Sequence, residues 1–205
     1  MEIIIIDYGV GNIGSIVNMF KRIGVKATLS SDETQIMQAN KLLLPGVGSF
    51  DKGMLNLQHS GLMNVLERKV VEQKTPILGI CLGMQLLFEK SEEGELPGLR
   101  WIAGEVRRFD FKSQSALRVP QMGWNEIRAT DYNSLFYGLE IEARFYFAHS
   151  YYVECREAAE ILATTEYGGA FVSAVNKGNI WGVQFHPEKS HRFGLQLLKN
   201  FIERT

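Results

Sequence analysis

Apolar residues in the first half of the chain form short continuous runs that alternate with amphipathic segments. Residues 3–6 are four isoleucines, and an unbroken apolar run of this length is typical of a strand buried on both faces. Residues 15–23 carry apolar side chains at helical spacing, and Gly24 follows them as a helix stop. The same alternation predicts strands at residues 26–30, 41–44 and 76–80, and helices at residues 62–74 and 82–89.

The second half has a different pattern, in which short aromatic and β-branched segments are separated by polar or glycine-containing turns. Such segments favour antiparallel or mixed pairing. They lie at residues 105–109, 144–148, 151–155, 170–175 and 180–184, and residues 191–204 predict a closing helix. We therefore predict an α/β fold with a central, mostly parallel sheet, helices on both faces and an additional mixed or antiparallel sheet. A length of 205 residues fits one domain, residues 1–205.

Composition excludes several classes of partner. The 22 Lys and Arg against 23 Asp and Glu give a formal net charge of -1, whereas nucleic-acid-binding proteins usually carry a basic excess. No stretch approaches the roughly 20 apolar residues of a membrane helix, and the acidic start is unlike a signal peptide. We therefore expect no nucleic-acid or membrane partner. With only two cysteines, Cys81 and Cys155, we expect a reducing cytoplasmic location.

A candidate nucleophile follows the strand predicted at residues 76–80. Residues 79–83 read Gly-Ile-Cys-Leu-Gly, the cysteine form of the G-x-S-x-G elbow, whose glycines permit a sharp turn from strand to helix. The N-terminus of the next helix favours the reactive thiolate form of Cys81. A small, buried, inert cysteine is the alternative, and this segment alone does not decide between the two. Cys155 has no elbow and is assigned to the inert class.

The candidate general base is His186, within residues 182–188, which read Gly-Val-Gln-Phe-His-Pro-Glu. Pro187 biases His186 toward extended dihedrals, and residues two apart in an extended chain point to the same side. Glu188 is therefore placed to accept a hydrogen bond from the imidazole, as the third member of a catalytic triad does. An ordinary strand end with a solvated His and Glu is the alternative, and the elbow at Cys81 favours the triad.

Two glycine-rich segments allow opposing interpretations. Residues 45–48 read Pro-Gly-Val-Gly and either aim backbone N–H groups at an oxyanion or form a plain turn, which this segment alone favours. Residues 9–14 match G-x-G-x-x-G, with Asp32 after the second strand, which is the context of an NAD(P)-binding oxidoreductase. That function is a remote alternative, because a second mononucleotide-binding half is missing. We expect no cofactor, and the scattered histidines and cysteines predict no metal site.

Residues 45–48, 79–85 and 182–188 together resemble class I (triad) glutamine amidotransferases, over nearly the whole chain. The resemblance implies the three-layer fold of that class and hydrolysis of L-glutamine. Cys81 would attack the side-chain amide to form a thioester, and His186, oriented by Glu188, would protonate the leaving ammonia and then activate water. Backbone groups of Val47 and Gly48 would form the oxyanion hole. The implied substrate-binding residues are Gln85, Glu93, Ser150 and Tyr151.

Within that class, residues 7–12, 120–125, 145–151 and 188–190 resemble glutaminase subunits of imidazole glycerol phosphate synthase. The resemblance implies a heterodimer with a (βα)8-barrel cyclase, in which ammonia crosses the barrel and the products are imidazole glycerol phosphate and aminoimidazole-carboxamide ribotide of histidine biosynthesis. It also implies a glutaminase that is weak alone and is stimulated when the cyclase holds its substrate. The implied partner-facing residues are Asn12, Gln121, Met122, Trp124 and Lys189.

Two features depart from that pattern. The family often has His where this chain has Gln121, which affects one interface contact. Residues 190–194 also resemble paralogous glutaminases that feed ammonia to the modification of nucleotide-linked sugars for surface polysaccharides. That pathway is the alternative to histidine biosynthesis.

Overall fold

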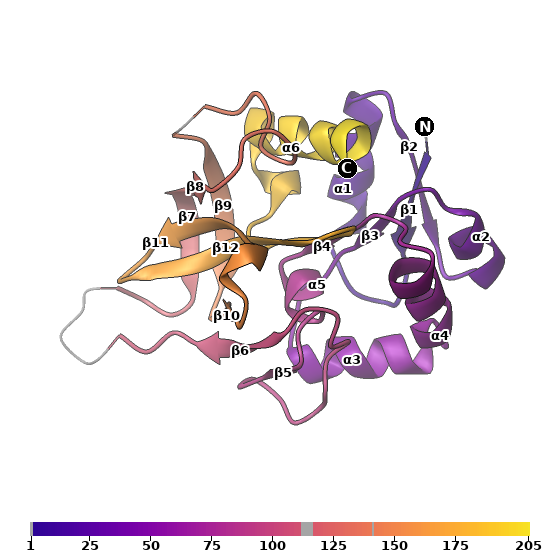
Figure 1. Cartoon of the computed structure of the whole chain (residues 1–205), viewed down its shortest axis with the longest axis horizontal. Coiled ribbons are helices and arrows are strands. Elements are labelled where there is room, and N and C mark those ends of the chain that lie inside the picture. The colour runs from indigo at the N-terminus through magenta and orange to yellow at the C-terminus, as the bar shows by residue number, and fades with distance from the viewer. Residues whose placement is uncertain (1, 112–116, 141) are drawn as a thin grey trace.

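A long twisted sheet crosses the molecule and carries helices on both of its faces (Figure 1). The computed structural model describes residues 2–111, 117–140 and 142–205. The strands of this sheet are β1 (Glu2–Ile6), β2 (Lys26–Ser30), β3 (Leu42–Leu44), β4 (Ile77–Ile80), β5 (Lys90–Ser91), β6 (Gly104–Arg108), β8 (Arg128–Ala129), β10 (Tyr151–Cys155), β11 (Ile161–Glu166), β12 (Ala170–Lys177) and β13 (Ile180–Val183). Their order is β2-β1-β3-β4-β13-β12-β10-β6-β5, with β11 beside β12 and β8 beside β11.

Helices surround the parallel part of the sheet. They are α1 (Ile13–Arg22), α2 (Glu33–Gln38), α3 (Phe50–His59), α4 (Met63–Leu66), α5 (Leu82–Gln85) and α6 (His191–Arg204). A π-helical turn, Glu67–Glu72, extends α4, and 3₁₀ turns span Ala158–Glu160 and Pro187–Lys189. Helices α1 and α6 cover one face, and α3 and α4 cover the other (Figure 1).

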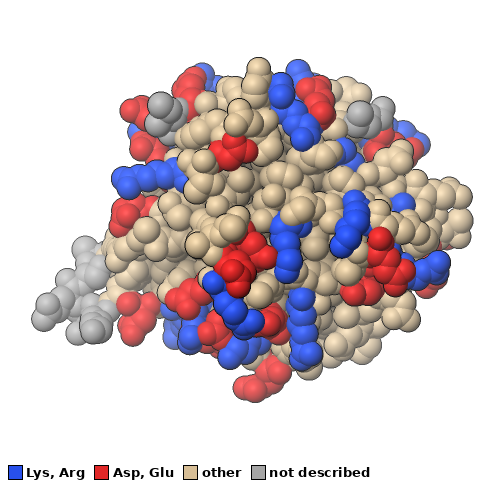
Figure 2. All heavy atoms as spheres, in the orientation of Figure 1, with Lys and Arg blue, Asp and Glu red and all other residues tan. Residues whose placement is uncertain are grey.

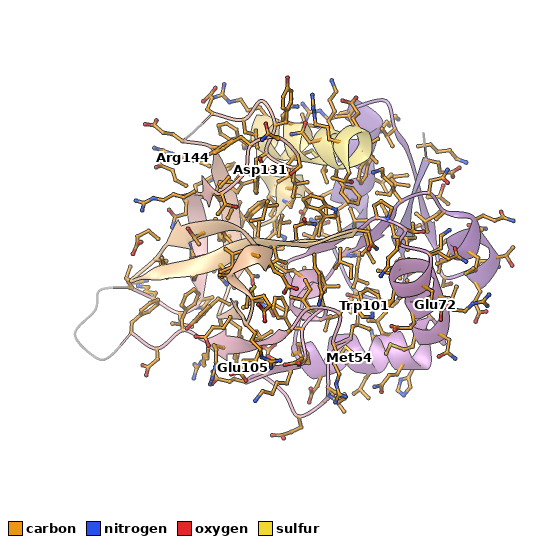
Figure 3. The ribbon with its side chains drawn as sticks, in the orientation of Figure 1. Met54, Glu72, Trp101, Glu105, Asp131 and Arg144 are labelled. Atoms are coloured by element: carbon orange, nitrogen blue, oxygen red, sulfur yellow. The ribbon has the colours of Figure 1, made fainter. Side chains whose placement is uncertain are left out.

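The parallel part confirms the prediction made from the continuous apolar runs. Strands β2, β1, β3, β4 and β13 pair in parallel. Ile3 and Ile5 of β1 pack with α1 and α6, whereas Ile4 and Ile6 belong to the core under α3 and α4. Met54 of α3 and Trp101 lie in this second core, on the side of α3 and α4 in Figure 3. A strand with a core on each face requires apolar residues at every position, which explains the isoleucine run.

The second half pairs in antiparallel and mixed fashion, as predicted. β12 pairs antiparallel with β13, β10 and β11, and β10 pairs antiparallel with β6. A separate two-stranded sheet joins β7 (Gln121–Glu126) to β9 (Arg144–His149). The sequence patterns did not identify β7, because its polar Gln121 is buried while Met122 and Trp124 are exposed. This inverts the usual relation between polarity and burial.

The helix predicted at residues 82–89 is wrong in length, since α5 ends at Gln85. The carbonyl groups of Leu86, Leu87 and Phe88 accept hydrogen bonds from the N–H groups of residues 99–102. The N–H of Glu89, which a helix reaching residue 89 would bond to the carbonyl of Gln85, donates instead to the carbonyl of Gly104. Helices α2 and α3 were not predicted, and α3 turns out to border the site.

Charge is mixed over the surface. On the face shown in Figure 2, acidic and basic side chains are interspersed, without an extended region of one sign. One group of ion pairs links Arg107 to the carboxylates of Glu92, Glu105 and Glu154. None of the helices within residues 2–111, 117–140 and 142–205 combines the length and the apolar character needed to cross a membrane.

Candidate active site

Cys81 lies at a strained turn between β4 and α5. Its φ is 53°, in the left-handed region that side chains rarely adopt, and its N–H donates to the carbonyl of Val183, 2.8 Å away in β13. A Cβ atom on Gly83 would lie 1.9 Å from the carbonyl oxygen of Leu44, and one on Gly79 would lie 2.7 Å from the carbonyl oxygen of Gly83. Only glycine allows the two backbone segments to approach this closely, so the predicted elbow forms.

His186 and Glu188 form a buried pair at the end of β13. His186 Nδ1 lies 2.8 Å from Glu188 Oε1, and the two side chains are 4% and 2% exposed. The N–H of His186 donates to the carbonyl of Tyr146 in β9. Ser190 also links the two segments, because its hydroxyl donates to the His186 carbonyl and accepts from the N–H of Tyr146. The strand end is therefore fixed at both sides of the imidazole.

The electrostatics of His186 favour its charged form. Burial alone lowers the pKa of His186, but hydrogen bonds to the Cys81 sulfur and the Glu188 carboxylate outweigh burial and raise this pKa to about 10. Opposite charges in a poorly solvated site stabilise each other. The arrangement is therefore suited to a thiolate on Cys81 paired with an imidazolium on His186, the form in which a cysteine is nucleophilic.

A cavity of about 390 Å³ opens in front of Cys81 and His186. Its walls include every residue that the sequence resemblance assigned to the oxyanion hole and to glutamine binding, together with Lys189. The lining consists of Val47, Gly48, Cys81, Leu82, Gln85, Glu93, Pro120, Ala148, His149, Ser150, Tyr151, His186 and Lys189. Among the described residues, no group of three or more His, Cys, Asp or Glu side chains is arranged to hold a metal ion.

His149 forms part of the cavity wall as a neutral imidazole. Burial lowers the pKa of His149 to about 4, although its hydrogen bond to Tyr151 acts in the opposite direction. Nδ1 lies 2.7 Å from the Tyr151 carbonyl, which can only accept, so the single ring proton is on Nδ1. Nε2 lies 3.0 Å from Oε1 of the Gln121 side chain, so a ring with its proton on Nδ1 requires Gln121 to turn its NH₂ group toward Nε2. Sequence reasoning did not connect these two residues, because β7 was not recognised.

Glu93 lies where the cavity meets α3. Its Oε2 accepts a hydrogen bond from the N–H of Phe50, 2.9 Å away, at the first residue of that helix. Burial is the main reason that the pKa of Glu93 is raised, and the neighbouring charge of Asp51 adds to the shift. A partly buried carboxylate with one free face can bind a cationic group such as an α-amino group.

The loop of residues 45–48 has a fixed stem and a free tip. The buried hydroxyl of Tyr8 donates to the carbonyl of Pro45, and a Cβ on Gly46 would lie 2.6 Å from the N atom of Gly83. At the tip, Val47 is 44% exposed, and Gly48 has a φ of 110° with open space where a Cβ would be. The stem is therefore held by close contacts, whereas the tip is exposed and no atom lies within 4 Å of the Cβ position at Gly48.

Three of the expected partner-facing side chains lie on one surface beside the cavity. Met122 is 67% exposed and Trp124 is 46% exposed, and Trp124 stacks on His191 with ring centroids 5.3 Å apart. The Lys189 ammonium lies 5.3 Å from the centroid of the Tyr146 ring. We call this the β7 surface, comprising Met122, Trp124, Tyr146, Lys189 and His191.

Asn12 is exposed at the start of α1. Gln121 differs from the other expected partner-facing residues, because it is 2% exposed and its amide is bonded to His149. In this structure its side chain is directed to the cavity wall and not to the surface.

The features that suggested a dinucleotide site have structural roles. The side chain of Asp32 caps α2 by accepting from the N–H of Gln35. Gly11 lies against Pro45, such that a Cβ would approach the proline ring at 3.1 Å. The glycine-rich loop therefore packs on the stem of the loop at residues 45–48.

Comparison with known proteins identifies the family that the three sequence motifs resemble. The model for "Glutamine amidotransferase class-I" matches residues 4–205. This chain belongs to the class-I glutamine amidotransferase family. The prediction from its three motifs is thereby confirmed, and the oxidoreductase alternative loses its basis.

Relatives and solved structures agree with this assignment. A protein of Methanococcus maripaludis named imidazole glycerol phosphate synthase subunit HisH 2 is 54% identical, over 99% of this chain and 100% of the relative. The HisH 2 protein of Pseudomonas aeruginosa is 48% identical, over 98% of both chains. A crystal structure of a glutamine amidotransferase superposes with a TM-score of 0.74 at 20% identity, covering 98% of this chain and 97% of the other. This amidotransferase therefore has the fold of its class.

Tyr8→Phe is expected to lower kcat for glutamine hydrolysis about tenfold while KM stays nearly unchanged. An oxyanion-hole donor contributes roughly 100–1000-fold to kcat, and a disturbed loop stem is expected to lose part of that contribution. The variant deletes the hydroxyl that holds Pro45 and leaves that carbonyl buried without its partner. Steady-state kinetics test this. Tyr167→Phe is the matched control, because it also removes a tyrosine hydroxyl that donates to a backbone carbonyl. That hydrogen bond, to Arg118 at 2.8 Å, is exposed to solvent. Equal kcat values in both variants would contradict the role of Tyr8.

Proposed function

We propose that this chain is the glutaminase subunit of an imidazole glycerol phosphate synthase in histidine biosynthesis. It hydrolyses L-glutamine to glutamate and ammonia at Cys81, with residues 1–205 acting as one domain. The observation that carries the chemistry is the contact of the strained Cys81 elbow with the buried pair of His186 and Glu188 at one cavity. The pathway is supported by the names of full-length relatives at 46–54% identity.

The reaction proceeds in two halves. The Cys81 thiolate attacks the carbonyl carbon of the glutamine side-chain amide, and the proton on His186 passes to the nitrogen as the carbon–nitrogen bond breaks. Ammonia leaves, and a γ-glutamyl thioester remains on Cys81. Neutral His186 then removes a proton from water, which attacks the thioester and releases glutamate and thiolate. Glu188 accepts from Nδ1 throughout, which keeps Nε2 free for these transfers.

The remaining groups position the substrate. Backbone N–H groups at Val47 and Gly48 stabilise the oxyanion of both tetrahedral intermediates, and the free tip of their loop allows this arrangement to form when the partner is engaged. The Glu93 carboxylate binds the α-amino group of glutamine. Ser150 and Tyr151 line the other side of the same cavity. A loop that completes the oxyanion hole only in the complex prevents loss of ammonia to water.

The β7 surface is the proposed docking site for a synthase subunit of (βα)8-barrel fold. It joins an exposed methionine and an exposed tryptophan, the residue types enriched at interface centres. Lys189 belongs both to this surface and to the cavity lining. Ammonia released at Cys81 therefore has a short route to the partner. A cytoplasmic location is part of the proposal, because Cys81 and Cys155 are both free thiols.

The test is ammonia release from glutamine by this chain, alone and with a histidine-pathway cyclase carrying its ribotide ligand. We expect weak release alone and strong stimulation by the liganded cyclase. If release depends on Cys81 but is not stimulated by this cyclase, the glutaminase activity stands and the pathway becomes surface-polysaccharide modification. No release under either condition would reject the proposal.

Met122→Glu is expected to weaken association with the cyclase at least about tenfold, because it places a charge at the most exposed of the large apolar side chains on the β7 surface. Leu55→Glu is the matched control, since Leu55 is an exposed apolar residue of α3 outside this surface. Binding is measured by titration calorimetry. If the two substitutions weaken binding equally, the β7 surface is not the docking site.

A further inference from the structure

A second polar group, besides His186, contacts the sulfur of Cys81. The side-chain Nε2 of Gln184 lies 3.6 Å from Cys81 Sγ, within the range of a hydrogen bond to sulfur. Gln184 is 0% exposed, so this amide has no access to solvent. Gln184 directly follows β13, and its backbone N–H donates to the carbonyl of Ser173. A buried amide at the nucleophile requires an explanation, because burying it without partners is costly.

The orientation of this amide is fixed by a chain of three side-chain hydrogen bonds. Nε2 of Gln85 donates to the backbone carbonyl of Tyr151, 3.1 Å away, and to Oε1 of Gln184, 3.0 Å away. A carbonyl only accepts, so Gln85 must direct its NH₂ group at Tyr151. That NH₂ group also requires an acceptor on Gln184, which places the Gln184 oxygen toward Gln85. The Gln184 NH₂ group is thereby directed at the sulfur.

The reverse orientation is unfavourable at every step. Turning the Gln184 amide would place its oxygen against Cys81 and its NH₂ group against the NH₂ group of Gln85. Turning Gln85 as well would place its oxygen against the Tyr151 carbonyl, without a proton between them. Both glutamines are almost fully buried, at 0% and 4% exposure, so these unfavourable contacts would have little compensation from water.

We propose that Gln184 is a catalytic residue that donates a hydrogen bond to the Cys81 sulfur, and that Gln85 is a positioning residue that fixes the donor direction. This inference rests on the proposed glutaminase function and deepens it. The sulfur is negatively charged before attack and again when water displaces it from the thioester. An N–H aimed at the sulfur stabilises that charge, so it favours the thiolate and assists departure of the sulfur. Gln85 then acts through Gln184, although it also lines the glutamine cavity.

Gln184→Met tests this, since it keeps an unbranched side chain and removes the donor. The pH midpoint of Cys81 alkylation by iodoacetamide is expected to rise by about 1–2 units, the range of a hydrogen bond to a charged group. The kcat is expected to fall at least about tenfold, with more γ-glutamyl thioester on Cys81 in the steady state because the second half-reaction slows. Mass spectrometry locates both adducts, which is necessary because Cys155 is also a free thiol.

Gln85→Met is the second variant, and we expect it to raise the pH midpoint of Cys81 alkylation by less than Gln184→Met does. The matched control is Asn200→Leu, because Asn200 is also a buried amide, 1% exposed, that donates to two backbone carbonyls in a different part of the core. An unshifted alkylation midpoint in both glutamine variants would overturn the inference. If the unsubstituted chain releases ammonia normally in that case, the proposed glutaminase function stands; if it releases none, the function itself fails.

Discussion

Replacing Cys81 with serine is expected to reduce ammonia release from glutamine by about 10⁴-fold or more, as loss of the nucleophile does in other triad enzymes. The serine hydroxyl is a far weaker acid than a thiol. The Cys81 sulfur and the Glu188 carboxylate together raise the pKa of His186 to about 10, and the serine variant leaves His186 with Glu188 alone. Because serine is nearly isosteric with cysteine, we expect the elbow at residues 79–83 to persist.

The measurement is ammonia release with the liganded cyclase, accompanied by thermal unfolding to verify the fold. Cys155→Ser is the control, because burial raises the pKa of that thiol to about 12 and keeps it unreactive. Full activity in Cys81→Ser would show that the nucleophile lies elsewhere. Equal losses in the two serine variants would point to a general effect of removing a thiol.

Glu188→Gln is expected to lower kcat by about 10³–10⁴-fold with little change in KM. The Glu188 carboxylate only accepts, which holds the imidazole proton on Nδ1, 2.8 Å away. An amide in its place can direct its NH₂ group at Nδ1. The proton then moves to Nε2, the nitrogen required to accept protons during turnover. The variant also removes a negative charge that raises the pKa of His186.

The pH profile separates these effects. In the unsubstituted chain, hydrolysis is expected to decline as pH rises through about 10, where His186 loses the proton that the leaving ammonia requires. In Glu188→Gln this falling limb moves to lower pH. Glu160→Gln is the matched control, because Glu160 is another largely buried carboxylate with one paired oxygen and one oxygen without a partner. A reduced kcat in Glu160→Gln, or an unshifted limb in Glu188→Gln, would contradict this role.

The sequence by itself determined the local elements whose signals are strong. A run of four isoleucines predicts a strand with a core on each face, since a half-exposed strand would alternate. Glycines on both sides of Cys81 predict a sharp elbow, and the structure shows why no other residue fits there. The two-residue spacing of His186 and Glu188 across Pro187 predicts their contact, because an extended segment places both on one side.

The tertiary structure decided which of these elements meet. Parallel pairing of β4 with β13 brings Cys81 to His186, and no local pattern in either segment specifies that pairing. The burial of Gln121, the bond from Tyr8 to Pro45 and the amide chain from Gln85 to Gln184 each join residues distant in sequence. Periodicity records only which face of its own element a residue occupies. What lies opposite that face depends on how the whole sheet is assembled, so these contacts were visible only in the folded chain.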